Sequence, residues 1–531
     1  MRSHLENTVS SIYLMCRPCP SPLNPVVSMQ AYRFRLTPNT VPTPLLRKSF
    51  FATWGRIPRP AKVSIEGDEL LVCPVGKGSG TLHVFWPHHL LGVIVESTDS
   101  LLPRPNPYLL VKELGRGALG RLSKKIADWQ VLGFQPPDDL AQSILDVSRR
   151  FSKAATSDET NTDVEKEFVE ILERLENIIL EASRHFTDQS LAWRVRAGEK
   201  IPVCFGVGIR EPMIETLYEF GLYAGCLHEA FHAVLPMPTW RELEPEPGIF
   251  QWEQLEKCLV NPQRFGFRVV LGPLLDFDRS SLPTWLLTDM KRPGFFEERA
   301  ARFVLTIMEK YDYLADVWIL ASKTNSHCIP EFSVGRGLDL IQWLGRQIRQ
   351  RSIEHSLVVG VDQPWGEYGL DRTPDLELFQ VAERLANSPE IDSLLMELNI
   401  GLDTQSTFPR DPISVASMID TWSFLGKNLY VSFSVPSVSD ADPLDGLLAE
   451  EFQWSEGLQQ LWAEAMLTTL LTKRSVCGIF WTPLQDADPD SWEDTKTLAV
   501  PPQAFRGLID DQRVLKLAFK QFAAFREAWL K

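Results

Sequence analysis

A glutamate inside an apolar strand is the first residue that could do chemistry. In the stretch SLLMELNI (393–400), Glu397 and Asn399 share one strand face, while three apolar side chains share the other. The apolar face predicts contact with covering helices, so we expect Glu397 and Asn399 to point into the interior of the fold. A carboxyl group there loses water, its pKa rises, and it can act as a general acid.

A second glutamate follows another apolar stretch. Glu367 lies in DQPWGEYG (362–369), close in sequence to Trp365 and Tyr368. Aromatic rings of this kind offer a flat surface for a sugar, and the carboxylate could supply the base or nucleophile that complements Glu397. The alternative is structural, because a loop glutamate often caps a helix or binds loop amides.

Further polar residues follow other apolar stretches. Asp276 and Asp278 come after GPLL, and Asn325 comes shortly after DVWILAS. Asp276 and Asn325 are therefore candidates for substrate binding, with a solvated loop as the alternative for Asn325. The alternative for Glu397 is a structural ion pair with Lys323.

The elements that must position these residues alternate between strand and helix from residue 201 to the end. Eight short apolar strands separated by helical stretches predict an α/β fold, a (β/α)₈ TIM barrel over 200–531. Active sites on that fold lie at the carboxyl ends of the strands. The candidate strands are 201–207, 230–236, 267–275, 316–322, 357–365, 392–400, 429–435 and 476–484.

The N-terminal part has a different pattern. Residues 30–111 alternate without a sustained helical period and predict a β-rich, sandwich-like module. Residues 1–28 lack such a pattern and predict a disordered tail or a mis-assigned start, with Met29 as the true first residue.

Residues 112–195 predict a helical segment that packs on the barrel. Gly115, Gly117 and Gly120 form a GxGxxG pattern within it. A dinucleotide site needs a preceding buried strand and an acidic residue about twenty positions later. The surrounding apolar spacing instead favours a plain amphipathic helix, so we expect no cofactor.

The composition of the chain limits the classes of molecule that it is expected to bind. The chain has 531 residues and a net charge of −15, from 54 basic and 69 acidic residues. This balance argues against nucleic-acid and anionic membrane partners. No apolar run approaches the ~18 residues of a membrane span, and no signal-peptide pattern opens the chain, so a cytoplasmic location is expected. Cys16 and Cys19 form a lone CxxC, too little to predict a metal. The oligomeric state stays open.

The stretch WRELEPEPGIFQW (240–252) resembles the segment after the second barrel strand of glycoside hydrolase family 10, the xylanase-type retaining glycosidases. The matching residues are Trp240, Leu243, Glu244, Pro245, Gly248, Phe250 and Trp252. Four more motifs follow in the family's order, in 282–287, 303–318, 391–400 and 478–492. The resemblance covers about 200–531 and implies a barrel that acts on or binds a β-linked oligo- or polysaccharide.

The residues at the family's catalytic positions differ. The resemblance places the acid/base glutamate at Lys323 and the nucleophile at Ser432, or at Phe433 if the register slips by one. The family's sugar-binding Asn, Lys and His fall on Pro236, Thr239 and Pro273. Retaining hydrolysis needs two carboxyl groups about 5–5.5 Å apart. This chain therefore cannot run the family mechanism with the family's residues.

The resemblance also implies a sugar-stacking role for Trp481 at the end of the eighth strand, whereas Trp240 and Trp285 suit packing. Three hypotheses follow. The chain is a divergent glycoside hydrolase that uses Glu367 and Glu397, or a catalytically inactive barrel that binds a carbohydrate, or a structural protein without a ligand.

Overall fold

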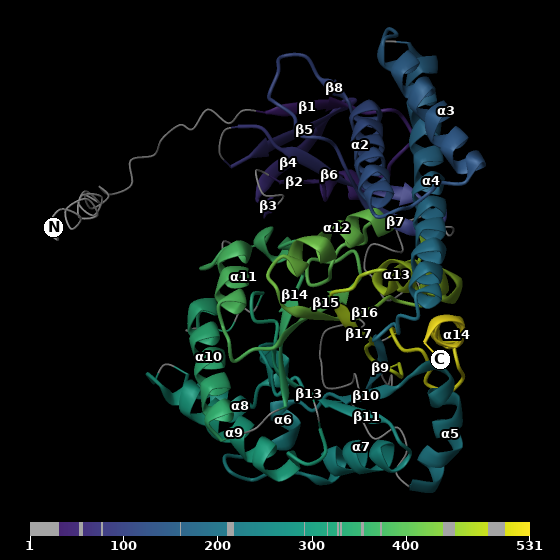
Figure 1. Ribbon diagram of the computed structural model, residues 1–531. Coiled ribbons are helices and arrows are strands. Elements are labelled where there is room, and N and C mark those ends of the chain that lie inside the picture. The colour runs from purple at the N-terminus through teal and green to yellow at the C-terminus, as the bar shows by residue number, and fades with distance from the viewer. Residues whose placement is uncertain are drawn as a thin grey trace, which may run out of the picture.

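The computed structural model describes residues 31–530 except for several internal stretches. These are 53–56, 76–77, 160, 210–216, 291, 316, 327–328, 330–331, 352–354, 372–373, 439–451 and 487–504. The predictions for residues 1–28 and for Met29 lie outside the described residues. Figure 1 shows the N-terminal sheets on one side of a larger body of strands and helices.

The N-terminal module contains two four-stranded sheets. One has the order β4-β5-β1-β8 and the other the order β3-β2-β6-β7. Apolar side chains of both sheets belong to one buried cluster, and the second sheet also contributes Phe50, Phe85 and Val95 to the cluster of the barrel. The second sheet is therefore packed on both faces. The bounds are β1 Tyr32–Arg35, α1 Thr43–Arg47, β2 Phe50–Ala52, β3 Pro58–Arg59, β4 Ala61–Glu66, β5 Glu69–Pro74, β6 Thr81–His88, β7 Gly92–Ser97 and β8 Tyr108–Leu109.

Three helices follow the module: α2 (Leu110–Val131), α3 (Asp138–Ala155) and α4 (Thr162–Arg196). The GxGxxG pattern lies within α2. A Cβ added at Gly117 would lie 2.0 Å from the carbonyl oxygen of Ser97 at the end of β7. This glycine thus lets the helix approach the sheet closely, which gives the pattern a packing role.

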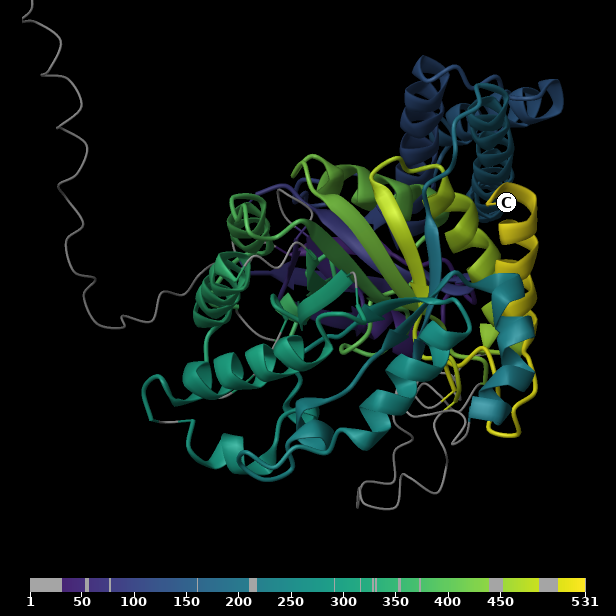
Figure 2. The ribbon, with the colours of Figure 1, turned by 60° about the horizontal axis from the view of Figure 1, so that its bottom comes forward.

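Eight parallel strands close into a barrel, as predicted. Each pairs with its neighbour in parallel, β17 pairs with β9, and β11 pairs with β13. In Figure 2 the helices lie around these strands. The strands are β9 Cys204–Ile209, β10 Ala233–Pro236, β11 Arg268–Leu271, β13 Val317–Ser322, β14 Ser356–Asp362, β15 Ser393–Asn399, β16 Asn428–Ser434 and β17 Val476–Trp481, and a short β12 (Leu275–Asp276) extends the pairing of β13.

The main helices of the barrel alternate with its strands. They are α5 Leu217–Ala230, α7 Glu253–Arg264, α9 Phe295–Tyr311, α10 Val334–Gln350, α11 Leu378–Ala386, α12 Pro412–Ser423, α13 Glu456–Leu471 and α14 Leu517–Trp529. The short helical turns are α6 Trp240–Leu243, η1 Arg279–Ser281, α8 Thr284–Thr288 and η2 Glu367–Gly369. Within the described residues, no helix is both long enough and apolar enough to cross a membrane.

The interior of the barrel is filled by apolar side chains. Alternate residues of the strands form one buried cluster inside, and the residues between them pack against the helices. The inner cluster includes Val358 of β14, Leu395 of β15 and Phe480 of β17. Polar side chains that follow these residues on the same face must therefore emerge at the carboxyl end of the barrel.

Candidate functional site at the carboxyl end of the barrel

Polar and acidic side chains gather where β12, β13, β14 and β15 end. Asp362 is the register partner of Glu397 across β14 and β15, and Asp276 is the partner of Ser322 across β12 and β13. Residues paired in parallel strands point to the same face of the sheet. These side chains therefore share the inner face of the barrel end, which is where this fold places its active sites.

Glu397 is held from two directions. The hydroxyl of Ser322 donates to its Oε1 at 2.5 Å, and the amide of Lys323 donates to its Oε2 at 3.1 Å. Gly360 makes room for it, because a Cβ there would lie 2.7 Å from Oε2. Burial raises the pKa of Glu397 to about 8, and the neighbouring Asp362 adds to the rise. With this pKa, Glu397 is protonated at neutral pH. Its side chain is half-buried at the barrel end.

Asp362 is the second carboxyl group of the site. The side chain of Asn325 brackets its backbone, accepting from its amide at 2.9 Å and donating to its carbonyl at 2.7 Å. The hydroxyl of Ser326 donates to Oδ2 at 3.1 Å, whereas Oδ1 has no hydrogen-bond partner among the described residues. Burial raises the pKa of Asp362 to about 6, against the lowering effect of the Lys323 ammonium.

Lys323 connects this pair to the loop after β12. Its ammonium contacts Asp278 at 2.6 Å, and only its backbone amide contacts Glu397. The expected Lys323–Glu397 ion pair is therefore wrong. Burial would lower the pKa of Lys323, but Asp276, Asp278 and Asp362 together raise it. Burial would raise the pKa of Asp278, but Lys323 holds it at about 2.

The backbone at the site is strained. Lys323 has a φ of 54° and Gln363 a φ of 45°, a region that side-chain-bearing residues rarely adopt. Such conformations persist only when the surroundings hold them, and they cluster at functional sites. The two residues follow Ser322 and Asp362, the last residues of β13 and β14.

The arrangement separates the proton affinities of two neighbouring carboxyl groups. Near neutral pH the Asp362–Glu397 pair holds one proton, which resides mainly on Glu397. The pair can donate one proton and accept another, and its neutral acid can also donate a hydrogen bond to a ligand. Because the charge of Asp362 raises the pKa of Glu397, the two groups titrate as a unit.

Glu367, the other predicted catalytic residue, is not at this site. Its side chain is 0% exposed, and Oε1 pairs with Nη1 of Arg410 at 2.5 Å. The guanidinium of Arg410 also lies 4.3 Å from the centre of the Trp365 ring and so covers one face of it. The predicted catalytic role of Glu367 is therefore corrected, because a fully buried carboxylate paired with an arginine is not open to a substrate.

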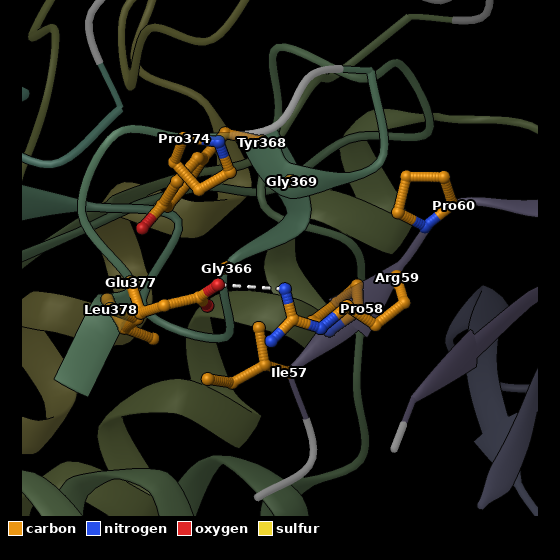
Figure 3. A pocket seen from close by; sticks show the side chains of 10 residues that line it. All are labelled: Ile57, Pro58, Arg59, Pro60, Gly366, Tyr368, Gly369, Pro374, Glu377 and Leu378. Carbon is orange, nitrogen blue, oxygen red and sulfur yellow. Dashed lines mark hydrogen bonds and ion pairs between the residues drawn. The ribbon is translucent and has the colours of Figure 1, made fainter. Parts of the chain in front are cut away.

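Tyr368 lies between the barrel and the N-terminal module. It is buried and lines a cavity of about 20 Å³, room for about one water molecule, together with Ile57, Pro58 and Gly366. Figure 3 shows these side chains and the neighbouring contact of Arg59 with Glu377, which measures 2.9 Å. Such a cavity does not admit a sugar, so the expected platform role of Tyr368 is wrong.

Trp481 and Asn325 are fully buried as well. The indole of Trp481 donates to the carbonyl of Arg506 at 2.7 Å and packs edge-on against Phe433 and Phe522. The register explains this, since Phe480 takes the interior position and Trp481 faces the helices. Neither the ring of Trp481 nor the amide of Asn325 is free for a ligand, which corrects both predictions.

Two of the predicted binding residues do lie at the barrel end. Asn399 is half-buried, and its Oδ1 accepts from the hydroxyl of Ser434 at 3.2 Å. Asp276 is half-buried and accepts from the amide of Asp278 and from the hydroxyl of Ser281. Both keep polar atoms for further contacts.

The sequence reasoning missed Asp362 and Ser322, although a signal was present. Val358, Gly360 and Asp362 share one strand face by the same alternation that placed Glu397. In β16, Ser432 is the register partner of Glu397, whereas Phe433 packs outside.

The described residues contain one group that resembles a metal site: His88, His89 and Glu176, whose ligand atoms all lie within 4.8 Å of one another. The fit is poor. Nδ1 of His88 accepts from the amides of Leu90 and Leu91, so the neutral ring carries its proton on Nε2, the atom that faces Glu176. That nitrogen then has no lone pair for a metal.

The fold and the site together define a (β/α)₈ barrel with an acidic, hydrogen-bonded carboxyl end. No family model and no curated protein matches the sequence. Solved structures similar to the chain include xylanase B from Clostridium stercorarium F9, at 14% identity over 60% of this chain and 96% of that one, with a TM-score of 0.44. Another is xylanase 10B from Thermotoga maritima, at 13% identity over 62% of this chain and 96% of that one, with a TM-score of 0.44. This likeness concerns the fold alone.

Proposed function

We propose that the protein binds a carbohydrate at the carboxyl end of its barrel and does not use the two-carboxylate route of retaining glycosidases. One observation carries the proposal. Lys323, with its ammonium on Asp278, and buried Ser432 stand at the two positions where the resemblance to family 10 implies carboxylates. A double displacement needs carboxyl groups on both sides of the sugar.

The chemistry of the barrel end suits a ligand with many hydroxyl groups. Protonated Glu397, the amide of Asn399, the ammonium of Lys323 and the carboxylate of Asp276 provide donors and acceptors within one region. Among the described residues, the aromatic side chains predicted as platforms are buried or partly covered. Affinity should therefore come mainly from hydrogen bonds, and it should be modest because water competes for them.

A second candidate function is hydrolysis by the Asp362–Glu397 pair. The specific observation in its favour is the separation of their proton affinities, which is typical of an acid and its complementary base. In this case protonated Glu397 would donate to the leaving oxygen, and Asp362 would take the proton of the attacking water.

Calorimetric titration with xylo- and gluco-oligosaccharides, combined with product analysis, separates the two functions. We expect saturable binding without products, and a loss of about tenfold in affinity when Asn399→Ala removes two or three hydrogen bonds. Glu253→Gln, on the exposed face of α7, is the matched control and should bind like the wild type.

Two results would change the assignment. Products formed by the wild type and abolished in a folded Glu397→Gln variant would replace binding with hydrolysis. If the panel shows neither binding nor products, both functions are rejected and the hypothesis of a structural protein without a ligand remains.

A further inference from the structure

The loops that follow β14 and β15 are tied to each other. Nε2 of Gln363 donates to the carbonyl oxygens of Thr404 at 2.9 Å and Ser406 at 3.1 Å. The indole of Trp422, on α12, donates to the carbonyl of Pro364 at 3.4 Å. These loops begin directly after the strands that carry Asp362 and Glu397, so the ties fix the separation of the two strand ends.

A buried ion pair forms the centre of this connection. Glu367 is 0% exposed and Arg410 is 5% exposed at the side chain, and their charged atoms are 2.5 Å apart. Arg410 also donates to the carbonyl of Phe408 at 3.0 Å. A buried pair of this kind adds little net stability compared with apolar packing, but it tolerates only one relative position of its two loops.

The N-terminal module holds the same loops from outside. The amide of Val95 donates to the carbonyl of Pro409 at 2.7 Å, and the ring of Phe408 packs against Phe85 at 4.9 Å and Phe50 at 5.7 Å. The ammonium of Lys48 donates to the carbonyl of Leu402 at 2.9 Å.

A second contact reaches the loop after β14. Arg59 pairs with Glu377, and a Cβ added at Gly366 would lie 3.6 Å from Ile57, as Figure 3 shows for the surrounding side chains. The module therefore touches the loops that leave both site strands.

We propose that Glu367 and Arg410 are positioning residues for the Asp362–Glu397 pair, and that the N-terminal module is part of the same functional unit. The ion pair and the module contacts keep the two strand ends in the register that places the carboxyl groups side by side. The strained φ of Gln363, between Asp362 and the ion pair, is held by its side-chain bonds to the other loop. The effect on ligand binding rests on the proposed function; the effect on the carboxyl groups does not.

The test follows the carboxyl groups directly. In ligand-free protein labelled with ¹³C at the side-chain carboxyl carbons, the coupled titration of the Asp362–Glu397 pair is followed at the carboxyl carbon of Asp362, whose signal is assigned by its loss in Asp362→Asn. The charge of Glu367 is among those that raise the pKa of Asp362. Glu367→Gln would lower the midpoint of Asp362 through the lost repulsion alone, so the positioning role is tested with Glu367→Asp, which keeps the charge and shortens the side chain. The loops must shift to keep the ion pair, and we expect the midpoint of Asp362 to move by at least about half a pH unit.

A second pair of variants tests the module and does not depend on the buried ion pair folding normally. Arg59→Ala breaks a contact between module and barrel, whereas Arg33→Ala breaks the Arg33–Glu69 pair inside the module. We expect Arg59→Ala to shift the Asp362 titration and weaken oligosaccharide binding two- to threefold, and Arg33→Ala to change neither.

Unchanged titration of Asp362 in folded Glu367→Asp, or in Arg59→Ala if Glu367→Asp does not fold, would overturn the positioning role. A shifted titration in a protein that binds no oligosaccharide would support positioning and reject the proposed function. The two failures are thus separate.

Discussion

Glu367 and Glu397 belong to neighbouring segments of the same barrel, yet their surroundings make them opposites. Glu397 accepts from a hydroxyl and a backbone amide at the open end of a strand, and it keeps its proton near neutral pH. Glu367 is fully buried and paired with Arg410 where the loops after β14 and β15 meet the N-terminal module, a region called the joint below. Glu397 is therefore partly accessible at the barrel end, whereas Glu367 is enclosed between the loops and the N-terminal module.

The surroundings of a glutamate, more than its residue type, therefore decide whether it can contact a ligand or only hold two segments together. At Glu397, loss of water and the neighbouring Asp362 raise the pKa by more than the hydrogen bonds from Ser322 and the Lys323 amide lower it, so the acid stays protonated. A guanidinium fixes the charge and the position of the group, and removing it leaves that charge stranded.

Removing the cation should cost far more in the joint than at the barrel end. Arg410→Met leaves Glu367 buried and unpaired, and we expect the free energy of unfolding to fall by about 3–5 kcal/mol. Lys323→Met leaves Asp278, which is 38% exposed at the side chain and can be hydrated, so we expect a loss of about 1 kcal/mol. Urea unfolding at pH 7 measures both. Equal losses of unfolding free energy in the two variants would show that the barrel end and the joint do not differ in this respect.

The second prediction concerns pH. The pKa of Glu397 is about 8 in the folded protein and about 4.5 when unfolded, so the native state keeps a proton that the unfolded chain releases. Stability contributed by this proton is complete below about pH 4.5 and is lost as pH rises toward 8. We expect Glu397→Gln to remove a fall of about 2–3 kcal/mol in unfolding free energy between pH 5 and 9.

Denaturation series at several pH values provide the measurement for Glu397→Gln, and Glu253→Gln, 84% exposed at the side chain, is the control that should keep the wild-type slope. A variant with the full wild-type pH dependence would show that Glu397 is ionised in the folded protein.

Much of the fold could be predicted from the sequence. Each of the eight barrel strands is a short apolar run bounded by helix, and that pattern depends only on local periodicity. The face of Glu397 followed from the same alternation, which the structure confirms through the packing of Leu394, Met396 and Leu398 outside and Leu395 inside.

The rest depended on contacts between distant segments. Arg410 lies 43 positions from Glu367, and no local pattern announces that pairing. Trp481 was misplaced for a related reason, because one step along a strand moves a side chain from the interior to the helices. Periodicity thus located strand ends and faces, but the partners of the polar side chains came only with the tertiary structure.

Gly360 offers a steric test of the space around Glu397. In Gly360→Ala the new Cβ would lie 2.7 Å from Oε2, so the carboxyl group must move and lose its bond from the Lys323 amide. We expect a loss of about 1–2 kcal/mol in unfolding free energy. Gly225→Ala, on α5 with nothing within 4 Å, should instead stabilise the protein by about 0.5–1 kcal/mol.

A double variant distinguishes steric contact from backbone effects. If Glu397→Ala relieves the crowding, the losses in Gly360→Ala and Glu397→Ala will not add. Simple additivity would mean that the two residues do not compete for the same space.

The smallest effect is expected at Asp278, the partly exposed carboxylate that pairs with Lys323 at the barrel end. Lys323 lowers its pKa to about 2 from 3.8, so its contribution is present above pH 3.8 and is lost as pH falls through 2. Because the side chain is 38% exposed, solvent screening reduces the contribution to about 1 kcal/mol. Asp278→Asn should therefore lower the unfolding free energy by that amount at pH 7 and by almost nothing at pH 2.

Asp146→Asn is the control, from a more exposed pair with Arg149, and it should change the unfolding free energy by less than about 0.5 kcal/mol. A loss at Asp278 as large as that of Arg410→Met would place the barrel end in the same class as the joint, a rigid ionic connection instead of a site open to ligand.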